Sequence, residues 1–348
     1  MGSEADIRPV TWQDGAVRII DQTALPGQLR YLDLGTVDEL IGAIQRLAVR
    51  GAPALGVAGA YGVALALLTN ADRASIARLR AARPTAVNLA AGVDRASARI
   101  EEGFEAVLAE AHAVLDENLT ANRRLSELGA DWLLRRLASG PAGVDVRRPL
   151  RLLTHCNAGA LATAGWGTAL GVVRELHARG LVEVVYVDET RPLLQGSRLT
   201  AWELAQLGIP HLVQADGAAA GTIVSGSVDA AIVGADRIAA NGDTANKVGT
   251  LGVALACAHA EVPFLVAAPT STVDLATASG ADIRVELRDE AEVLGWSGAA
   301  EPVAPRESHG HNPAFDVTPA GLVSALTTER GVLEIARGEL PGTLWEAR

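Results

Sequence analysis

The chain has 348 residues, 49% of them hydrophobic and 20% charged, a balance typical of a globular protein with a substantial core. Thirty basic against forty-one acidic residues give a net charge of −11, and no cluster of lysine or arginine interrupts the acidic excess. These features exclude disorder as the expected state. They also argue against nucleic acid as a partner, because a nucleic-acid-binding surface needs positive charge to neutralise phosphates.

The N-terminal residues MGSEADIRPV contain neither a basic segment nor an apolar run, and the longer apolar segments are interrupted well before the ~18 residues that a membrane span needs. Cys156 and Cys257 are the only cysteines, too few for a disulfide framework and without the paired spacing of a structural zinc site. We therefore expect a cytoplasmic protein with no membrane partner.

The first elements along the chain are two short β-rich segments, residues 17–23 (VRIIDQT) and 28–34 (QLRYLDL), whose connection ALPG predicts an antiparallel pair. Residues 35–51 (GTVDELIGAIQRLAVRG) then predict a helix that Thr36 caps and Gly51 ends, with two acidic residues in its first turn. Helical patterns dominate the chain from there to the break described next.

Residues 139–149 (SGPAGVDVRRP) form a glycine- and proline-bearing break, which divides the chain into an N-terminal strand-plus-helical domain, 1–145, and a second domain, 146–348. Beyond the break, short apolar runs alternate with helical patterns. The candidate strands are residues 150–155, 182–188, 211–214, 230–236 and 263–269. Most of these runs are continuously apolar, which is typical of parallel strands covered by helices on both faces. The pattern predicts the α/β class, with a mostly parallel, doubly wound sheet.

Four of these strands are followed by a polar residue near their carboxyl ends, where doubly wound sheets bind ligands: Cys156, Asp188, Asp216 and Asp236. Cys156 stands in THCNAG between polar neighbours and a small-residue turn, although a buried, inert thiol is an equal alternative. Asp236 follows small and apolar residues, so its carboxyl is expected to be desolvated. Desolvation raises a carboxyl pKa, which suits a general acid; an aspartate that caps a turn is the alternative.

Two glycine-bearing segments are candidates for anion binding. In residues 48–62 (AVRGAPALGVAGAYG), Arg50 stands beside a turn that opens a helix, where backbone N–H groups and a guanidinium together can hold an anion. In residues 241–250 (NGDTANKVGT), Asn246 and Lys247 stand beside loop glycines. Close helix packing and a surface loop are the respective alternatives. A dinucleotide-binding GxGxxG after the first strand of the second domain and a P-loop motif are both missing, which argues against these two classes.

A set of motifs occurs in one order and at consistent spacing: RGAPALG (50–56), RPTAVNL (83–89), THCNAG (154–159), VYVDETRPLLQGSRLTAWEL (185–204), VGADRIAANGDTANKVGT (233–250) and NPAFDVTP (312–319). Through these motifs the sequence resembles the S-methyl-5-thioribose-1-phosphate isomerases, methionine-salvage enzymes in the superfamily of the translation initiation factor two B regulatory subunits. The resemblance runs from about residue 7 to 335. It implies a small N-terminal domain, a Rossmann-like C-terminal domain and a homodimer.

The resemblance also implies an active site and a reaction. The family's catalytic cysteine and aspartate match Cys156 and Asp236, and its substrate-binding residues match Arg50, Gly51, Ala52, Arg83, Gln195, Asn246 and Lys247. The implied activity is that of an aldose-ketose isomerase, an intramolecular oxidoreductase, which converts 5-methylthioribose 1-phosphate to 5-methylthioribulose 1-phosphate. This small-molecule phosphosugar substrate calls for neither a metal nor an organic cofactor.

One segment departs from the family's pattern. Where the family usually has Glu-Arg, Thr-His and a tyrosine before NPAFD, this chain has Leu287-Arg288, Leu294-Gly295 and His311. We expect this segment to border the pocket, so it bears on the identity of the substrate more than on the reaction class.

Three alternatives stay open at this stage. The substrate can be a related 1-phosphosugar, such as 5-deoxyribose 1-phosphate or ribose 1,5-bisphosphate; the bisphosphate would need a second basic cluster, which the sequence does not reveal. The chain can instead be a non-catalytic subunit that senses sugar phosphates or nucleotides. The isomerisation can proceed through an enol phosphate or through hydride transfer from C2 to C1, with Cys156 in a different role in each.

Overall fold

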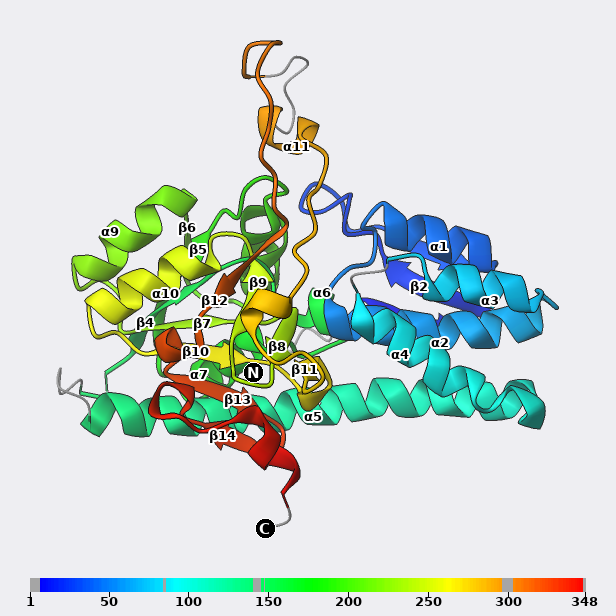
Figure 1. The fold of residues 1–348 in the computed structure, drawn as a ribbon, viewed down its shortest axis with the longest axis horizontal. Helices are drawn as coiled ribbons and strands as arrows, with labels where there is room; N and C mark the ends of the chain where they lie inside the picture. The colour runs from blue at the N-terminus through cyan, green and yellow to red at the C-terminus, as the bar shows by residue number, and fades with distance from the viewer. Residues whose placement is uncertain (1–6, 84–85, 140–144, 147, 296–302, 347–348) are drawn as a thin grey trace.

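A computed structural model describes residues 7–83, 86–139, 145–146, 148–295 and 303–346. A small antiparallel sheet with its helices lies beside a larger, mostly parallel sheet, and one long helix, α5 (Phe104–Ser139), runs along both parts (Figure 1). The predicted break at 139–149 falls partly on residues outside the described ranges. The domain boundary at 145/146 stays a prediction, because α5 contributes to the hydrophobic clusters of both parts.

The N-terminal part begins with a three-stranded sheet in the order β1, β2, β3. The predicted antiparallel pair is confirmed as β2 with β3, where Val17 lies opposite Leu34. Strand β1, which pairs with β2, was not predicted. The elements before α5 are β1 (Val10–Gln13), β2 (Ala16–Ile20), β3 (Tyr31–Leu34), α1 (Val37–Gln45), α2 (Ala52–Leu68), α3 (Arg73–Arg80) and α4 (Val87–Ser97).

Helix α1 begins as predicted and ends early. The Thr36 hydroxyl accepts a hydrogen bond from the Glu39 N–H at 3.3 Å, and the Glu39 carboxylate accepts one from the Thr36 N–H at 3.0 Å, which forms a capping box. The predicted end at Gly51 is wrong, because α1 ends at Gln45. Leu47 has a left-handed φ of 63°, and the chain turns before α2 begins.

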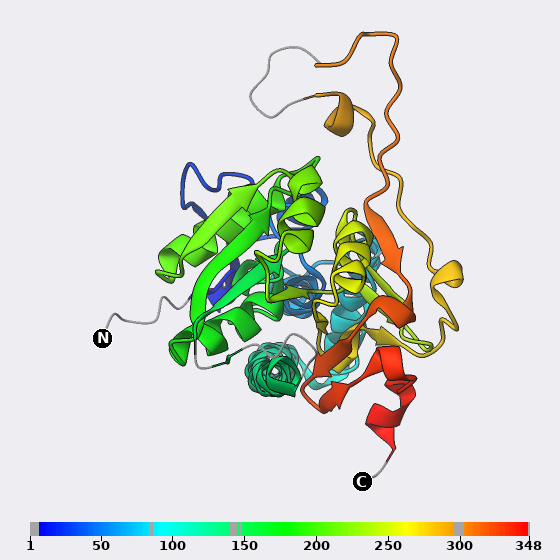
Figure 2. The ribbon, with the colours of Figure 1, turned by 90° about the vertical axis from the view of Figure 1, so that its left-hand side faces the viewer.

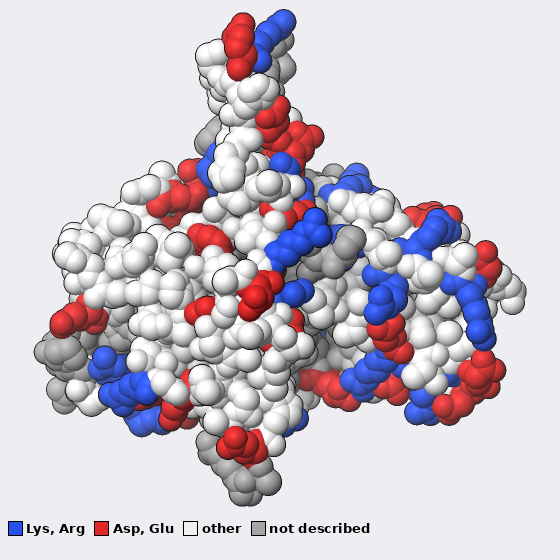
Figure 3. Space-filling model, viewed as in Figure 1, with Lys and Arg blue, Asp and Glu red and all other residues white. Residues whose placement is uncertain are grey.

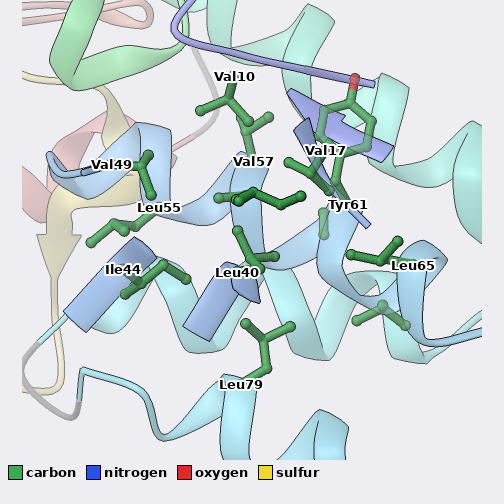
Figure 4. Close-up of a cluster of buried hydrophobic side chains, with 14 of the residues drawn as sticks. Val10, Val17, Leu40, Ile44, Val49, Leu55, Val57, Tyr61, Leu65 and Leu79 are labelled. Atoms are coloured by element: carbon green, nitrogen blue, oxygen red, sulfur yellow. The ribbon is translucent and has the colours of Figure 1, made fainter. Parts of the chain in front are cut away.

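Helix α2 forms the centre of the N-terminal core and is buried on nearly all sides. Its glycines allow close packing, since a Cβ added at Gly92 of α4 would lie 2.0 Å from the carbonyl oxygen of Gly56. Figure 4 shows side chains from the sheet, α1, α2 and α3 converging in this core, with Leu40, Leu55 and Leu79 among them. The apolar side chains thereby fix the position at which α2 begins.

The C-terminal part contains a seven-stranded sheet in the order β14, β13, β10, β7, β4, β5, β6, as predicted mostly parallel. Only β14 runs antiparallel to its neighbour among these described strands. The strands are β4 (Leu150–Thr154), β5 (Val182–Asp188), β6 (His211–Gln214), β7 (Ala230–Val233), β10 (Phe264–Ala267), β13 (Ala325–Thr328) and β14 (Gly331–Leu333).

Helices cover both faces of this sheet (Figure 2). Leu152 packs in the cluster formed with α5, α7 and α8, whereas the next residue, Leu153, packs in the cluster formed with α9 and α10. This alternation buries both faces of β4, which explains why adjacent residues of this strand are both apolar. The α-helices that follow α5 along the chain are α6 (Ala160–Thr163), α7 (Ala169–Ala178), α8 (Ala201–Gln206), α9 (Ala219–Val224), α10 (Thr250–His259) and α11 (Ala291–Leu294). None of the described helices is both long and apolar enough to cross a bilayer.

A second, four-stranded sheet has the order β11, β8, β9, β12. It consists of β8 (Arg237–Ala239), β9 (Thr244–Lys247), β11 (Val273–Asp274) and β12 (Phe315–Thr318). Between β11 and β12, the segment that carries α11 extends away from the body of the molecule (Figures 1 and 2). The surface-loop alternative for residues 241–250 is wrong where β9 lies, because this strand is buried.

Candidate active site

A cleft of about 770 Å³, including its open mouth, lies where the carboxyl ends of β4, β7 and β10 face the N-terminus of α2. This is the edge at which doubly wound sheets bind ligands. Every site residue predicted from the sequence lines it: Arg50, Gly51, Ala52, Arg83, Cys156, Gln195, Asp236, Asn246 and Lys247. The fold therefore brings together residues from both parts of the chain.

Cys156 follows β4, and hydrogen bonds between its backbone and two threonine side chains hold it in place. Its φ is 64°, its N–H donates to the Thr190 hydroxyl at 2.9 Å, and its carbonyl accepts from the Thr200 hydroxyl at 2.6 Å. The thiol is 8% exposed and lines the cleft. Cys257 of α10 differs, because it packs in the core, where burial raises the pKa of its thiol to about 12.

Asp236 follows β7, and its N–H donates to the carbonyl of Ala245 at 2.9 Å. Burial raises the pKa of its carboxyl, against the opposing charges of Lys247, Arg50 and Arg83. The predicted direction of the shift is confirmed, and its cause is desolvation. A carboxyl of this kind holds its proton to higher pH than an exposed aspartate and can donate it to a bound ligand.

Arg50 and the start of α2 form a cationic wall. Its Nη2 donates at 2.7 Å to both the backbone carbonyl and the side-chain oxygen of Asn157, while its Nε is buried without a hydrogen-bond partner among the described residues. Gly51 is the N-cap residue of α2, with a φ of 96° and no capping side chain, and Ala52 begins the helix. The start of α2 therefore lines the cleft without a capping side chain, a setting that favours an anion.

Asn246 and Lys247 lie at the end of β9 and line the same cleft. The Lys247 ammonium lies 4.9 Å from the centroid of the Phe315 ring. Burial lowers the pKa of Lys247, and the neighbouring Cys156 and Asp236 oppose that shift. The Asn246 amide donates to the Thr250 hydroxyl at 2.9 Å, which fixes its orientation.

Gln195 and Arg83 complete the predicted set. Gln195 is 5% exposed, and its side-chain oxygen is buried with no hydrogen-bond partner in the described part of the chain. Arg83 lies 3.9 Å from the carboxylate of Glu286, and burial lowers the pKa of its guanidinium. Arg50 Nε and Gln195 Oε1 are thus two buried polar atoms, in residues that line the cleft, that the described chain leaves unbonded.

Two other strand-end carboxylates, Asp188 and Asp216, do not line the cleft. Asp188 contacts His155, and Asp216 accepts hydrogen bonds from the N–H groups of Thr190 and Arg191 at 2.7 Å. His155, Asp188 and Asp216 place potential metal-ligand atoms within 4.8 Å of one another. Since protein partners already occupy these groups, we assign them to holding the loops around the cleft.

Sequence reasoning missed several groups. The departing segment borders the cleft through Arg288, as expected, whereas Leu287 is 69% exposed. Asn157, which binds Arg50, stands within the quoted motif THCNAG, but only its neighbour Cys156 was selected. An adjoining pocket, which shares Arg50 and Gln195 with the cleft, is lined by three further arginines from separate segments, Arg46, Arg191 and Arg198. Their separation in sequence hid this basic cluster.

The sequence profile of the Initiation factor 2 subunit family matches residues 48–335, so the chain belongs to this family. Within it, the chain is 52% identical to a methylthioribose-1-phosphate isomerase of Anaeromyxobacter dehalogenans, with 94% of each sequence covered. It is also 52% identical to a probable bifunctional methylthioribose-1-phosphate isomerase/methylthioribulose-1-phosphate dehydratase of Nocardia farcinica. That match covers 97% of this chain but only 61% of the longer relative.

Solved structures confirm the fold class. The 5-methylthioribose 1-phosphate isomerase of Pyrococcus horikoshii superimposes with a TM-score of 0.86 at 37% identity, covering 98% of this chain and 96% of that one. The translation initiation factor eIF-2B subunit delta from A. fulgidus gives a TM-score of 0.82 at 40% identity, covering 94% and 96%. The fold thus occurs under both names, and the site has to distinguish the two functions.

Proposed function

We propose that this chain is an aldose-ketose isomerase that converts 5-methylthioribose 1-phosphate to 5-methylthioribulose 1-phosphate in methionine salvage. The observation that carries the proposal is the meeting of a thiol, a desolvated carboxyl and a cationic wall in one cleft. Relatives that bear the name of this isomerase match across nearly the whole chain.

The substrate's phosphate binds at the cationic wall in this proposal. Arg50, the amides of Gly51 and Ala52, and Lys247 surround one part of the cleft. The Nε of Arg50 supplies a donor that a phosphate oxygen would satisfy. The wall gives a local positive site in a chain of net charge −11.

Asp236 acts as the acid that opens the sugar ring. Because the anomeric oxygen carries the phosphate, the ring cannot open to a free aldehyde in the usual way, so the ring C–O bond must break while the phosphate stays in place. Protonation of the ring oxygen by the Asp236 carboxyl makes that oxygen a better leaving group. The raised pKa of Asp236 keeps the required proton available.

Two routes then lead to the ketose. In one, a base removes the C2 proton to give an enol phosphate, and Cys156 serves as that base or as a proton relay. In the other, a hydride moves from C2 to C1, and Cys156 orients and stabilises the transition state. The small residues beside Cys156, such as Ala158 and Ala162, leave few groups to hold water in this part of the cleft, which suits either route.

A sugar panel tests the proposal. Purified protein is supplied in turn with 5-methylthioribose 1-phosphate, 5-deoxyribose 1-phosphate and ribose 1,5-bisphosphate, and ketose formation is followed by ³¹P NMR. We expect the methylthio sugar to give the highest kcat/KM, because Leu47, Leu193 and Phe315 offer apolar contacts to its tail. Higher kcat/KM for the bisphosphate would move the assignment to that substrate, with the second phosphate among Arg46, Arg191 and Arg198.

Repeating the reaction in deuterated water separates the two routes. Deuterium at C1 of the product supports proton exchange through an enol phosphate. Product without deuterium at C1 supports direct hydride transfer.

A non-catalytic subunit is the second candidate, favoured by the 40% identity to the A. fulgidus translation factor structure. Such a module would bind the phosphosugar without converting it. The pairing of Cys156 with Asp236 favours the enzyme, since a binding module needs neither an acid nor a thiol. Tight binding of all three sugars without turnover would support the subunit instead.

We further propose that the protein is a cytoplasmic homodimer. The surface over α9 and α10 carries few charged side chains (Figure 3), and Val224 of α9 and Leu255 of α10 are exposed. Such a face limits repulsion between two acidic copies. Sedimentation should give a dimer that Val224→Asp weakens, and a monomer at micromolar concentration would refute the assembly.

The proposed cytoplasmic location is supported by the two free cysteines, which fit a reducing compartment.

A further inference from the structure

Glu203 of α8 is a buried carboxylate outside the proposed chemistry. It is 1% exposed, and it acts as the acceptor in each of its three side-chain hydrogen bonds to the described residues. Its Oε2 accepts from the Ala160 N–H at 2.7 Å, and its Oε1 accepts from the Leu161 N–H at 3.2 Å and from the Asn157 amide nitrogen at 2.8 Å. The Glu203 side chain therefore offers its neighbours acceptors and no donor.

The contacts on both sides of Asn157 fix the orientation of its amide. Its nitrogen faces Glu203 and the Thr200 hydroxyl, at 2.8 and 3.2 Å, and its oxygen faces Arg50 Nη2 at 2.7 Å. A guanidinium only donates and an ionised carboxylate only accepts, so the reversed amide would meet unfavourable partners on both sides. Glu203 thereby determines which atom Asn157 presents to Arg50.

Asn157 in turn orients the guanidinium of Arg50. Nη2 is bound by two oxygens of Asn157, and Nη1 lies 3.2 Å from the backbone oxygen of the same residue. These contacts occupy one side of the guanidinium, while Nε finds no hydrogen-bond partner within the described chain. The Asn157 contacts therefore fix the plane of the group, while the hydrogen-bond donor of Nε stays unused within the described chain.

We propose that Glu203 is a positioning residue, which acts through Asn157 to hold Arg50 in the orientation that binds the substrate's phosphate. The identity of that substrate rests on the proposed function, whereas the control of anion affinity does not. The site leaves little room for another arrangement, since a Cβ added at Gly159 would lie 2.4 Å from Glu203 Oε2.

Burial and hydrogen bonding act in opposite directions on the charge of Glu203. Burial raises the pKa of the Glu203 carboxyl, while the hydrogen bonds from Asn157, Leu161 and Ala160 and the charge of Arg50 oppose that shift. The three hydrogen bonds that Glu203 accepts suit its ionised form, and one amide side chain separates its carboxyl from the guanidinium of Arg50. Buried charges in such an arrangement depend strongly on their hydrogen bonds.

The test uses Glu203→Gln, Asn157→Asp and the double variant. The glutamine is nearly isosteric but turns a donor toward the Asn157 amide nitrogen or toward a backbone N–H. The aspartate places a second carboxylate against Glu203. In the double variant, the new amide at position 203 can donate to the new carboxylate at position 157, whose other oxygen again accepts from Arg50. Glu175→Gln is the control, because Glu175 pairs with Arg179 away from the cleft.

Three measurements are made on each folded variant: the Kd for inorganic phosphate by calorimetry, and KM and kcat for the methylthio sugar. We expect each single variant to raise Kd and KM about tenfold or more with a smaller change in kcat, the double variant to recover most of the loss, and Glu175→Gln to match the wild type. An unchanged phosphate Kd in folded Glu203→Gln overturns the proposal.

If Glu203→Gln does not fold, Asn157→Asp decides by the same measurements, and an unchanged Kd there overturns the proposal. Because the phosphate Kd needs no turnover, these results test the role of Glu203 even if the wild type fails to convert the sugar. That failure would overturn the proposed function alone.

Discussion

The Nδ1 atom of His155 lies 3.0 Å from Oδ2 of Asp188, in a buried pair that joins the carboxyl ends of β4 and β5. On the other side of the ring, Nε2 lies 2.8 Å from the carbonyl oxygen of Val248. A carboxylate and a carbonyl both accept hydrogen bonds, so the ring satisfies both partners only when both nitrogens carry hydrogen and the imidazole is a cation. His155 thus ties the segment that leads into Cys156 to the segment that follows Lys247.

This pair makes stability depend on pH. Burial opposes the charge of His155, but the hydrogen bond and charge of Asp188 outweigh it, so the pKa of His155 is raised. Its contribution to stability is therefore fully present below the unfolded-state pKa of about 6.5 and is lost as the pH rises through the folded-state pKa. We expect His155→Gln to lower the free energy of unfolding by about 1–3 kcal/mol at pH 6. Urea unfolding of the wild type and of His155→Gln across the pH range checks this. If the difference between their free energies of unfolding does not shrink at high pH, the ionised pair is refuted.

Gly51 is required by both its backbone angle and its surroundings. Its φ is 96°, and an added Cβ would lie 2.2 Å from the carbonyl oxygen of Ala162. We expect Gly51→Ala to destabilise the fold by about 2–5 kcal/mol and to weaken phosphate binding, because the start of α2 must move. Gly42→Ala in α1 is the matched control, since its Cβ would meet no atom within 4 Å, and it should be neutral or slightly stabilising. Equal melting temperatures for the two variants would contradict this account.

Asp229 ties the start of β4 to the strand beside it. Its carboxylate accepts from Arg148 at 2.6 Å and from the Arg151 N–H at 2.8 Å. Burial opposes its ionisation, but these hydrogen bonds outweigh burial and hold the pKa of Asp229 below its usual range. Its contribution is present above the unfolded-state pKa of about 3.9 and is lost as the pH falls through the folded-state pKa. Asp229→Asn should lower the free energy of unfolding by about 1–3 kcal/mol at pH 7 and by progressively less in acid, which denaturant unfolding measures. A loss that does not change with pH would argue against the pairing.

Lys247 should control substrate affinity more than turnover. Lys247 lines the same cleft as the start of α2, and its ammonium lies beside the Phe315 ring. We expect Lys247→Met to raise KM roughly tenfold to hundredfold, the effect of losing one charged hydrogen bond, with a smaller fall in kcat. Arg73→Met, which removes a cation from an exposed pair with Glu101, is the control. An unchanged KM in Lys247→Met would place the phosphate elsewhere.

Strands and strand ends were predictable because they depend on local patterns. Largely apolar runs marked β4, β5 and β7, and a polar residue lies in or near the carboxyl end of each strand. The sheet containing β9 was missed, because its antiparallel partner β12 lies about 70 residues further along the chain. The sequence pattern predicts a longer helix α1 than the structure has, since only the tertiary packing reveals the left-handed turn at Leu47.

The candidate site was predicted through the family motifs, and its supporting contacts were not. Cys156 and Asp236 stood at strand ends, where chemistry-bearing residues are expected. Glu203 and Asn157 also belong to the family motifs, but their role depends on the hydrogen bond between their side chains, which only the structure shows. Those hydrogen bonds connect residues about 40 positions apart and have no spacing signature in the sequence.

If Asp236 supplies the proton for ring opening, its loss should appear most clearly in the turnover of 5-methylthioribose 1-phosphate by Asp236→Asn beside the wild type. We expect the kcat of the folded variant to fall at least about a hundredfold, and Cys156→Ser, measured in parallel, to be impaired as well. Both variants should still bind inorganic phosphate, because the cationic wall is intact. Near-wild-type turnover by folded Asp236→Asn would contradict the account.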